Sequence, residues 1–201
     1  MKAYKRVSDE FADAFLGGSV RLGTAEEFRQ LEENEVGRGD RNELARTAHI
    51  LCGSETLSSD HPTLIDKVFF YKGGVRQTVD MVTVGETARE ILDAYLFCCS
   101  LTVDETDTRL GEALIEIADI EEFGRRLAAR SELNWREHHS GRVTYRVIED
   151  APSLAALTPV DPFEKHESFR WQDEYRLTWA MNMWEKPMIL SAPEVSDLLH
   201  R

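Results

Sequence analysis

The stretch from Ala94 to Val103 reads AYLFCCSLTV and decides how the rest of the chain is organised. It is almost continuously apolar, which is typical of a central strand that is covered on both faces. A later stretch, Glu174 to Met181, alternates strictly between apolar and more polar residues. This alternation predicts a strand with one face in the core and the other partly polar. We therefore place the centre of a sheet at residues 94–103 and a second long strand at residues 174–181.

Shorter patterns predict further strands and helices on both sides of this centre. Helices are expected after Ser8, after Thr24 and after Asp119, each of which is a residue type that caps helices, and a last short helix after Ser191. No linker or internal repeat divides the chain, so we expect residues 1–201 to form one α+β domain. Its mostly antiparallel sheet should carry three or four flanking helices. The other strands are expected at residues 2–7, 19–23, 68–71, 75–84, 112–118, 142–148 and 187–190.

The charge balance argues against several classes of function. The chain has 24 basic and 37 acidic side chains, a formal net charge of −13, which repels phosphate backbones and makes general nucleic-acid binding unfavourable. No apolar run approaches the ~20 residues that cross a bilayer. Acidic residues also interrupt the first 16 residues, unlike the apolar stretch of a signal peptide. We expect a cytoplasmic protein without membrane attachment, and the sequence leaves its oligomeric state open.

Common enzyme motifs are absent from the sequence. It contains no GxxxxGK[ST], GxGxxG, GxSxG or HExxH pattern. The six histidines show no spacing typical of metal ligands, so no metal site is expected. Cys98 and Cys99 lie in the most apolar stretch, where a thiol behaves as a small hydrophobic group and is a poor nucleophile.

Two polar pairs on expected strands are the first half of a candidate site. Arg6 lies near the end of the opening strand, with Tyr4 on the same face, and its guanidinium can bind a phosphate or carboxylate in a bidentate manner. Ser100 and Thr102 alternate onto one face of the central strand, where apolar residues would be expected. These four side chains are candidates for binding a ligand.

The other half of the candidate site lies where the last long strand begins. Gln172, Glu174 and Arg176 should point to the same side of the pleat. A carboxylate on a mostly buried strand needs partners. Glu174 therefore also has a purely structural explanation, an ion pair with Arg176 or Arg6.

Short motifs spread over most of the chain carry a first resemblance. They are Ala3-Tyr4-Lys5-Arg6, Val20-Arg21-Leu22-Gly23-Thr24 followed by Phe28-Arg29, Phe97-Cys98-Cys99-Ser100, and Phe163-Glu164-Lys165 followed by Phe169 to Leu177. In these motifs the chain resembles a bacterial and phage-associated family of domains of unknown function. That resemblance implies a fold more than a reaction.

The order of Arg6, then Ser100 with Thr102, then Gln172 with Glu174 carries a second resemblance. It is similar to the order in ADP-ribosyltransferases of the Arg, Ser, Glu type. The resemblance implies a split, mostly antiparallel sheet that holds NAD as a co-substrate. Within it Glu174 would be the catalytic carboxylate, since cleavage of the nicotinamide bond passes through an oxocarbenium-like transition state that a carboxylate stabilises.

The same resemblance implies roles for the remaining candidates. Arg6 would hold the pyrophosphate, and Ser100, with Thr102 beside it, would support the nicotinamide ribose. Gln172 would position the acceptor. Tyr4 would stack on a ring of the ligand, with Tyr175 as a poorer candidate because it alternates onto the core face. A loop at residues 34–42, which contains Gly37 and Gly39, would close over the site.

Three classes of function follow from these residues. The leading hypothesis is an NAD-cleaving ADP-ribosyltransferase or glycohydrolase with a protein or nucleotide acceptor. The alternative is a non-catalytic module that binds a nucleotide or a protein in the same pocket. A third class, a metal-independent hydrolase or nuclease that uses Asp173 and Glu174, is disfavoured for nucleic acid by the acidic surface.

Overall fold

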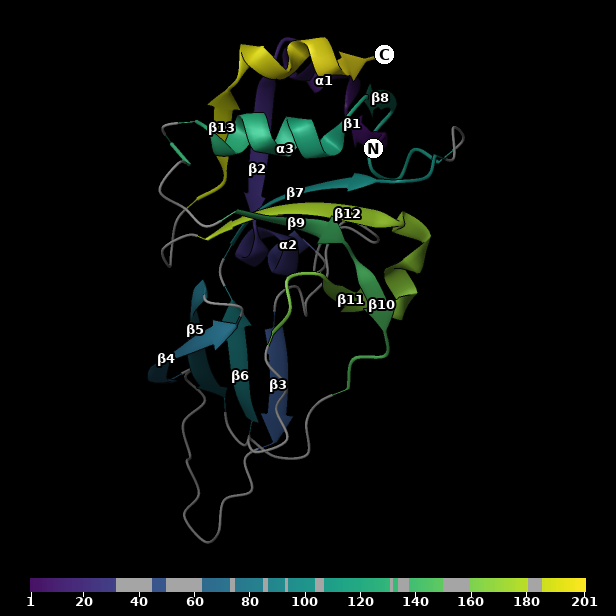
Figure 1. The fold of residues 1–201 in the computed structure, drawn as a ribbon. Coiled ribbons are helices and arrows are strands. Elements are labelled where there is room, and N and C mark those ends of the chain that lie inside the picture. The colour runs from purple at the N-terminus through teal and green to yellow at the C-terminus, as the bar shows by residue number, and fades with distance from the viewer. Residues whose placement is uncertain are drawn as a thin grey trace, which may run out of the picture.

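The fold is α+β, as the sequence predicts, and its sheets are mostly antiparallel (Figure 1). The computed structural model describes residues 1–31, 45–49, 63–72, 75–84, 87–92, 94–103, 107–130, 132–133, 138–149, 160–180 and 186–201. The loop expected at residues 34–42 lies outside these ranges. Most of the connection between residues 150 and 162 also lies outside them.

The larger sheet has eight strands and is centred on β7, as the apolar run at residues 94–103 predicts. Every strand pair in it is antiparallel. Its main order is β13 (Met188–Ser191), β2 (Ser19–Thr24), β7 (Ala94–Ser100), β1 (Ala3–Val7), β8 (Ala113–Ile117) and β14 (Leu199–His200). On the other edge of β7 follow β12 (Glu174–Ala180) and then β9 (His138–Arg142).

Two smaller sheets complete the described strands. A parallel pair joins β10 (Thr144–Arg146) to β11 (Glu164–His166). A four-stranded antiparallel sheet has the order β3 (Ala45–His49), β6 (Thr87–Leu92), β5 (Val75–Val84) and β4 (Thr63–Lys72). It contains the hairpin expected around residues 73–74, since β4 pairs with β5 up to Lys72 and Val75. Figure 1 shows this sheet below α2, away from the larger sheet.

The helices lie on both sides of the larger sheet (Figure 1). Two of the expected caps form: the Asp119 carboxylate accepts from the backbone N–H of Glu121 and Glu122, and Thr24 Oγ1 accepts from Glu27 N. The α-helices are α1 (Asp9–Leu16), α2 (Ala25–Leu31) and α3 (Ile120–Ala128). Two 3₁₀ helices, η2 (Glu167–Gln172) and η3 (Pro193–Leu198), are also described.

Several expected boundaries are wrong, each for a local reason. The strand expected at residues 142–148 is two strands, because the chain changes partner at Val143: β9 pairs with β12, whereas β10 pairs with β11. The helix expected after Ser191 is a 3₁₀ helix that begins at Pro193, because Ser191 belongs to β13. The helix after Asp119 ends at Ala128 rather than near Leu133, because the next backbone N–H groups donate to carbonyls only three residues back, Ala129 to Arg126 and Arg130 to Leu127.

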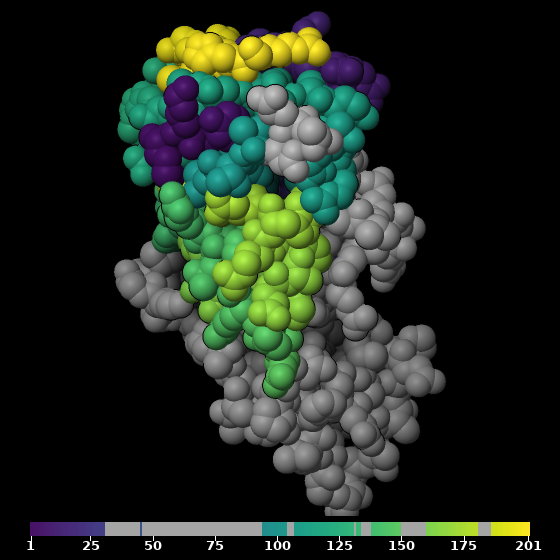
Figure 2. Space-filling model, turned by 90° about the vertical axis from the view of Figure 1, so that its right-hand side faces the viewer, coloured from purple at the N-terminus to yellow at the C-terminus, as the bar shows by residue number. Residues whose placement is uncertain are grey.

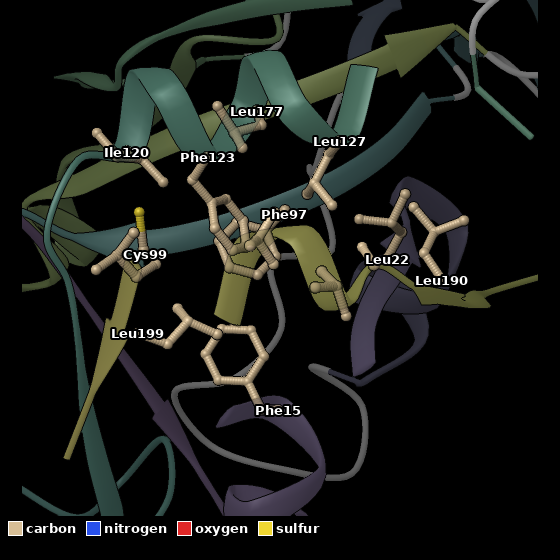
Figure 3. Close-up of a cluster of buried hydrophobic side chains, with 14 of the residues drawn as sticks. Phe15, Leu22, Phe97, Cys99, Ile120, Phe123, Leu127, Leu177, Leu190 and Leu199 are labelled. Carbon is tan, nitrogen blue, oxygen red and sulfur yellow. The ribbon is translucent and has the colours of Figure 1, made fainter. Parts of the chain in front are cut away.

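The main core lies between the larger sheet and the layer formed by α1, α3 and η3. Aromatic rings fill its centre: Phe97 on β7 lies 5.1 Å from Phe123 on α3 and 6.1 Å from Phe15 on α1, between ring centroids. Figure 3 shows these side chains together with the aliphatic residues around them. The alternation of β12 is confirmed, because Tyr175, Leu177 and Trp179 are all buried in this core. The side chains labelled in Figure 3 are Phe15, Leu22, Phe97, Cys99, Ile120, Phe123, Leu127, Leu177, Leu190 and Leu199.

The turn between α1 and β2 depends on a glycine in the left-handed region. Gly18 has φ +87°, and a Cβ built on it would lie 2.3 Å from the carbonyl oxygen of Ala192. Ala192 N in turn donates to Gly18 O at 2.8 Å. A side chain at position 18 would therefore be strained and would separate the turn from the segment before η3.

We expect Gly18→Ala to lower the free energy of unfolding by about 1 to 3 kcal/mol, because of the positive φ and the backbone contact. Gly17→Ala is the matched control, since Gly17 has φ −77° and a Cβ there would make only ordinary contacts of 3.4 Å or more. Urea unfolding of both variants checks this. Equal stability of the two variants would contradict the explanation.

Candidate functional site

The larger sheet is split beside β7. One edge of β7 pairs with β12 over its whole length, from Ala94 to Ser100. Two strands share the other edge: β2 pairs at residues 95 and 96, and β1 pairs only at Ser100. Among the described residues, no strand pairs with residues 97–99 on that edge. The sheet therefore opens between β1 and β2, and α1 connects these two strands.

A cavity of about 730 Å³ lies at this split. Its walls come from β1, α1, β2, α2, the end of β7, and the segment from η2 into β12. It combines apolar rings with four basic and four acidic side chains. All six candidates identified from the sequence line it: Tyr4, Arg6, Ser100, Thr102, Gln172 and Glu174.

Strand register explains why residues so far apart in sequence meet here. Ser100 is paired with Tyr4 on β1 and with Glu174 on β12, so the three residues form one row across the sheet. Paired residues of antiparallel strands point to the same face. Arg6 lies two residues beyond Tyr4 and shares that face. Figure 2 views the molecule from this end, where purple N-terminal residues, teal residues near position 100 and yellow-green residues near position 170 come together.

Two candidates reach the cavity by a route that the sequence did not predict. β7 ends at Ser100, so Thr102 lines the cavity from the segment after the strand. Gln172 is the last residue of η2 and not part of the pleat. Asp173 separates it from β12 with a left-handed conformation of φ 38° and ψ 56°, and its carbonyl accepts from Leu101 N at 2.9 Å. This bond ties the segment that carries Thr102 to the start of β12.

Glu174 lies in a buried cluster of charges. It is only 4% exposed, and Arg176 on the same strand is fully buried. Glu174 Oε1 accepts from Arg176 Nε at 2.5 Å, and Oε2 accepts from Lys165 Nζ at 3.1 Å. Arg176 Nη1 also donates to the carbonyl of Pro162 at 2.7 Å. The ion pair with Arg176, expected as the structural explanation of Glu174, is therefore present.

Lys165 is a site residue that the sequence did not predict. It lies on β11 and is 6% exposed, and its ammonium joins the two proposed catalytic side chains: Nζ donates to Gln172 Oε1 at 2.8 Å as well as to Glu174. The ammonium also lies 4.8 Å from the centroid of the Phe169 ring. The only available signal was the Phe163-Glu164-Lys165 motif, because β11 is three residues long and shows no periodicity.

The charge cluster keeps Glu174 ionised. Burial alone would raise the pKa of the Glu174 carboxyl, but the positive charges of Arg176 and Lys165 outweigh burial and lower it below the ordinary value. The backbone N–H of Glu174 donates to the hydroxyl of Tyr145 at 2.8 Å. Burial raises the pKa of that hydroxyl to about 12, so Tyr145 stays protonated near neutral pH. The site thus presents a fixed carboxylate, which can stabilise positive charge in a ligand.

The rim of the cavity carries a second aromatic and charged group. Trp171 lines the cavity, and the Arg109 guanidinium lies 3.5 Å from the centroid of its ring. Arg109 is also paired with Asp107 at 2.6 Å, which lowers the pKa of that carboxyl to about 2. Arg6 Nη1 donates at 3.3 Å to the carbonyl of Gly111 nearby. These contacts connect the segment after β7 to η2.

The cysteines of β7 line the cavity but are unsuited to nucleophilic chemistry, as expected. Burial raises the pKa of both thiols, that of Cys99 to about 12, so they are protonated near neutral pH. Within the described part of the chain, no three His, Cys, Asp or Glu side chains are grouped so that they could hold a metal ion.

Comparisons with protein-family models, with curated proteins and with solved structures found no match to this chain. The helices of the described residues include none that is both long enough and apolar enough to cross a bilayer. The geometry of the cavity is therefore the basis for assigning a function.

The buried cluster predicts a specific pH dependence of stability. Because the pKa of Glu174 is lowered in the folded protein, its contribution is complete above the unfolded value of about 4.3 and is lost as the pH falls below it. Glu174→Gln should cost about 3 to 5 kcal/mol near neutral pH, because it removes the carboxylate that contacts two buried cations. The difference from wild type should shrink below about pH 4.

Urea unfolding of both proteins between pH 7 and pH 3 measures this difference. The control is Glu116→Gln, which removes the carboxylate that pairs with the exposed ammonium of Lys2 and should have a small effect. A difference between wild type and Glu174→Gln that stays constant down to pH 3 would show that the cluster does not hold Glu174 ionised.

Proposed function

We propose that the cavity binds NAD and that Glu174 assists cleavage of the bond between nicotinamide and ribose, as in an ADP-ribosyltransferase or NAD glycohydrolase. One observation carries the proposal: the six residues chosen from the sequence for this chemistry all line one cavity, at a split in an antiparallel sheet. Their sequence positions span Tyr4 to Glu174, so only the fold brings them together.

The chemistry of the cavity supports each part of this proposal. Departure of nicotinamide leaves positive charge on the ribose ring, which an ionised carboxylate such as Glu174 stabilises. Ser100 is next to Glu174 in the register and offers a hydroxyl to the ribose or to the carboxylate. Arg6 supplies a guanidinium for the diphosphate, and Tyr4 supplies an aromatic face for a ring. Thr102 would add a second hydroxyl to the ribose side.

Gln172 and Lys165 complete the proposed machinery. In the structure the Gln172 carbonyl oxygen accepts from Lys165, which fixes the side chain beside Glu174. Gln172 would position the group that receives ADP-ribose, either water or a hydroxyl, amine or guanidinium of a nucleotide or protein. Lys165 is a positioning residue, because it holds both Gln172 and Glu174.

A specific observation also favours the second candidate, a module that binds a nucleotide without turnover. Both carboxylate oxygens of Glu174 already accept from a buried cation, Arg176 on one side and Lys165 on the other. A carboxylate held in this way has enough contacts for a purely structural role, in which it neutralises the buried cations. The same cavity would then bind its ligand unchanged.

Nicotinamide release from NAD distinguishes the two candidates. We expect wild-type protein to release nicotinamide and Glu174→Gln to lose at least about a hundredfold in rate, because removal of one charge-stabilising group commonly has that effect. The variant should still bind NAD. Glu116→Gln, on β8 outside the cavity, serves as the control and should keep the wild-type rate.

The double variant Glu174→Gln with Lys165→Met keeps the test valid if Glu174→Gln alone does not fold. Replacing Lys165 as well restores the net charge of the buried cluster, which Glu174→Gln alone makes more positive by one unit. A folded double variant without activity, beside an active wild type, supports the catalytic role. NAD binding by wild type without nicotinamide release would support the binding module and contradict cleavage.

A further inference from the structure

Lys5 breaks the apolar pattern of the core-facing side of β1. Ala3, Lys5 and Val7 alternate onto that side, and Lys5 is paired with Ile115 on β8. Ala3 and Ile115 are fully buried members of the main core, and Val7 packs against it. A charged group at such a position costs free energy unless it is paired or hydrogen-bonded. An apolar side chain would suit the position better, so Lys5 needs an explanation other than packing.

The ammonium of Lys5 reaches into the split of the sheet. Its Nζ donates to the carbonyl of Cys98 at 2.6 Å and lies 5.1 Å from the centroid of the Phe97 ring. Residues 97 and 98 belong to the part of β7 that has no strand partner on this edge. No carboxylate among the described residues bonds to this ammonium. Because an ammonium carries three donors, one carbonyl and one aromatic face leave Lys5 able to bind an anion.

Lys5 and Arg6 approach the same cavity from opposite faces of β1. Consecutive residues of a strand point to opposite faces, and Arg6 shares its face with Tyr4. Both basic side chains nevertheless line the cavity, because the cavity lies where the sheet is open. Two cations that line one cavity suit a ligand group with several anionic oxygens, such as a phosphate or diphosphate.

The other charges of the cavity do not compensate Lys5. Glu27 is paired with Arg21, and Asp107 is paired with Arg109. The Glu174 carboxylate is engaged by two cations, Arg176 and Lys165. Glu10 also lines the cavity, from an exposed position on α1. Among the described residues, Lys5 is thus a cation of the cavity whose hydrogen bond and ring contact involve no carboxylate.

We propose that Lys5 and Arg6 form an anion-binding subsite that takes the phosphate or diphosphate group of the ligand. The subsite deepens the proposed function, because it rests on the cavity as a ligand site and adds Lys5 to it. It also gives the ligand a chemical class: a small phosphate-bearing molecule that enters the split. The Lys5 ammonium is positioned by its hydrogen bond to the neutral carbonyl of Cys98. An anion can therefore bind to Lys5 without displacing a carboxylate among the described residues.

Equilibrium binding of ADP and adenosine to wild type and Lys5→Met tests this subsite without any turnover. The two probes share base and ribose and differ in the diphosphate. Wild type should bind ADP more tightly than adenosine, and Lys5→Met should weaken ADP binding by about tenfold or more while adenosine binding stays unchanged. Lys2→Met is the control, since Lys2 is exposed, pairs with Glu116 and lies outside the cavity.

Thermal melting of the free proteins separates binding from support of the fold. Methionine suits a core-facing position, so Lys5→Met should melt at the wild-type temperature or above it. A lower melting temperature of Lys5→Met with unchanged ADP affinity would overturn the proposal. It would show that Lys5 supports the fold at the split and does not bind the ligand. Absence of ADP binding to wild type at millimolar concentration would overturn it as well.

The outcome for Lys5 is independent of the outcome for NAD cleavage. ADP binding that depends on Lys5, in a wild type that releases no nicotinamide, leaves the subsite standing and refutes the catalytic proposal. Nicotinamide release that persists in Lys5→Met, with ADP affinity unchanged, refutes only the subsite.

Discussion

The pairing of Ser100 with two strands at once determines where the site lies. Tyr4 on β1 and Glu174 on β12 both pair with this residue. β1 leaves the edge of β7 immediately afterwards, while β2 pairs only near the other end. In the resulting gap, backbone groups of β7 have no neighbouring strand among the described residues to hydrogen-bond with on this edge. Lys5 replaces one missing donor, because its ammonium donates to the carbonyl of Cys98. The cavity, its polar lining and the position of Glu174 all follow from this arrangement.

Compared with apolar residues, the buried ion pairs around Glu174 add little to the free energy of unfolding, which points to a role other than stability. Buried ion pairs are often no more stabilising than apolar residues of similar volume. In the larger sheet, Lys5 on β1 and the Glu174–Arg176 pair on β12 place charge beside the core, and Lys5 and Glu174 line the cavity. Such local conflicts are typical of functional sites rather than of structural ones. The main core, by contrast, consists of closely packed aromatic and aliphatic side chains.

The sequence predicted the two long strands that have the clearest apolar patterns, and the Thr24 and Asp119 caps. The apolar run at residues 94–103 identified β7, and strict alternation identified β12 and its core-facing side. It could not predict features that depend on partners distant in sequence. The change of partner at Val143 and the short strand that carries Lys165 leave no periodic signal. The convergence of the six candidates was a prediction from residue order, and strand register supplies its physical cause.

A crystal structure of the wild-type protein with NAD or ADP-ribose tests the central claim most directly. We predict electron density for the ligand in the split between β1 and β2. The phosphates should lie against Lys5 and Arg6, and the nicotinamide ribose should lie against Ser100 and Glu174. A ligand bound elsewhere, or phosphates that point away from these two cations, would contradict it.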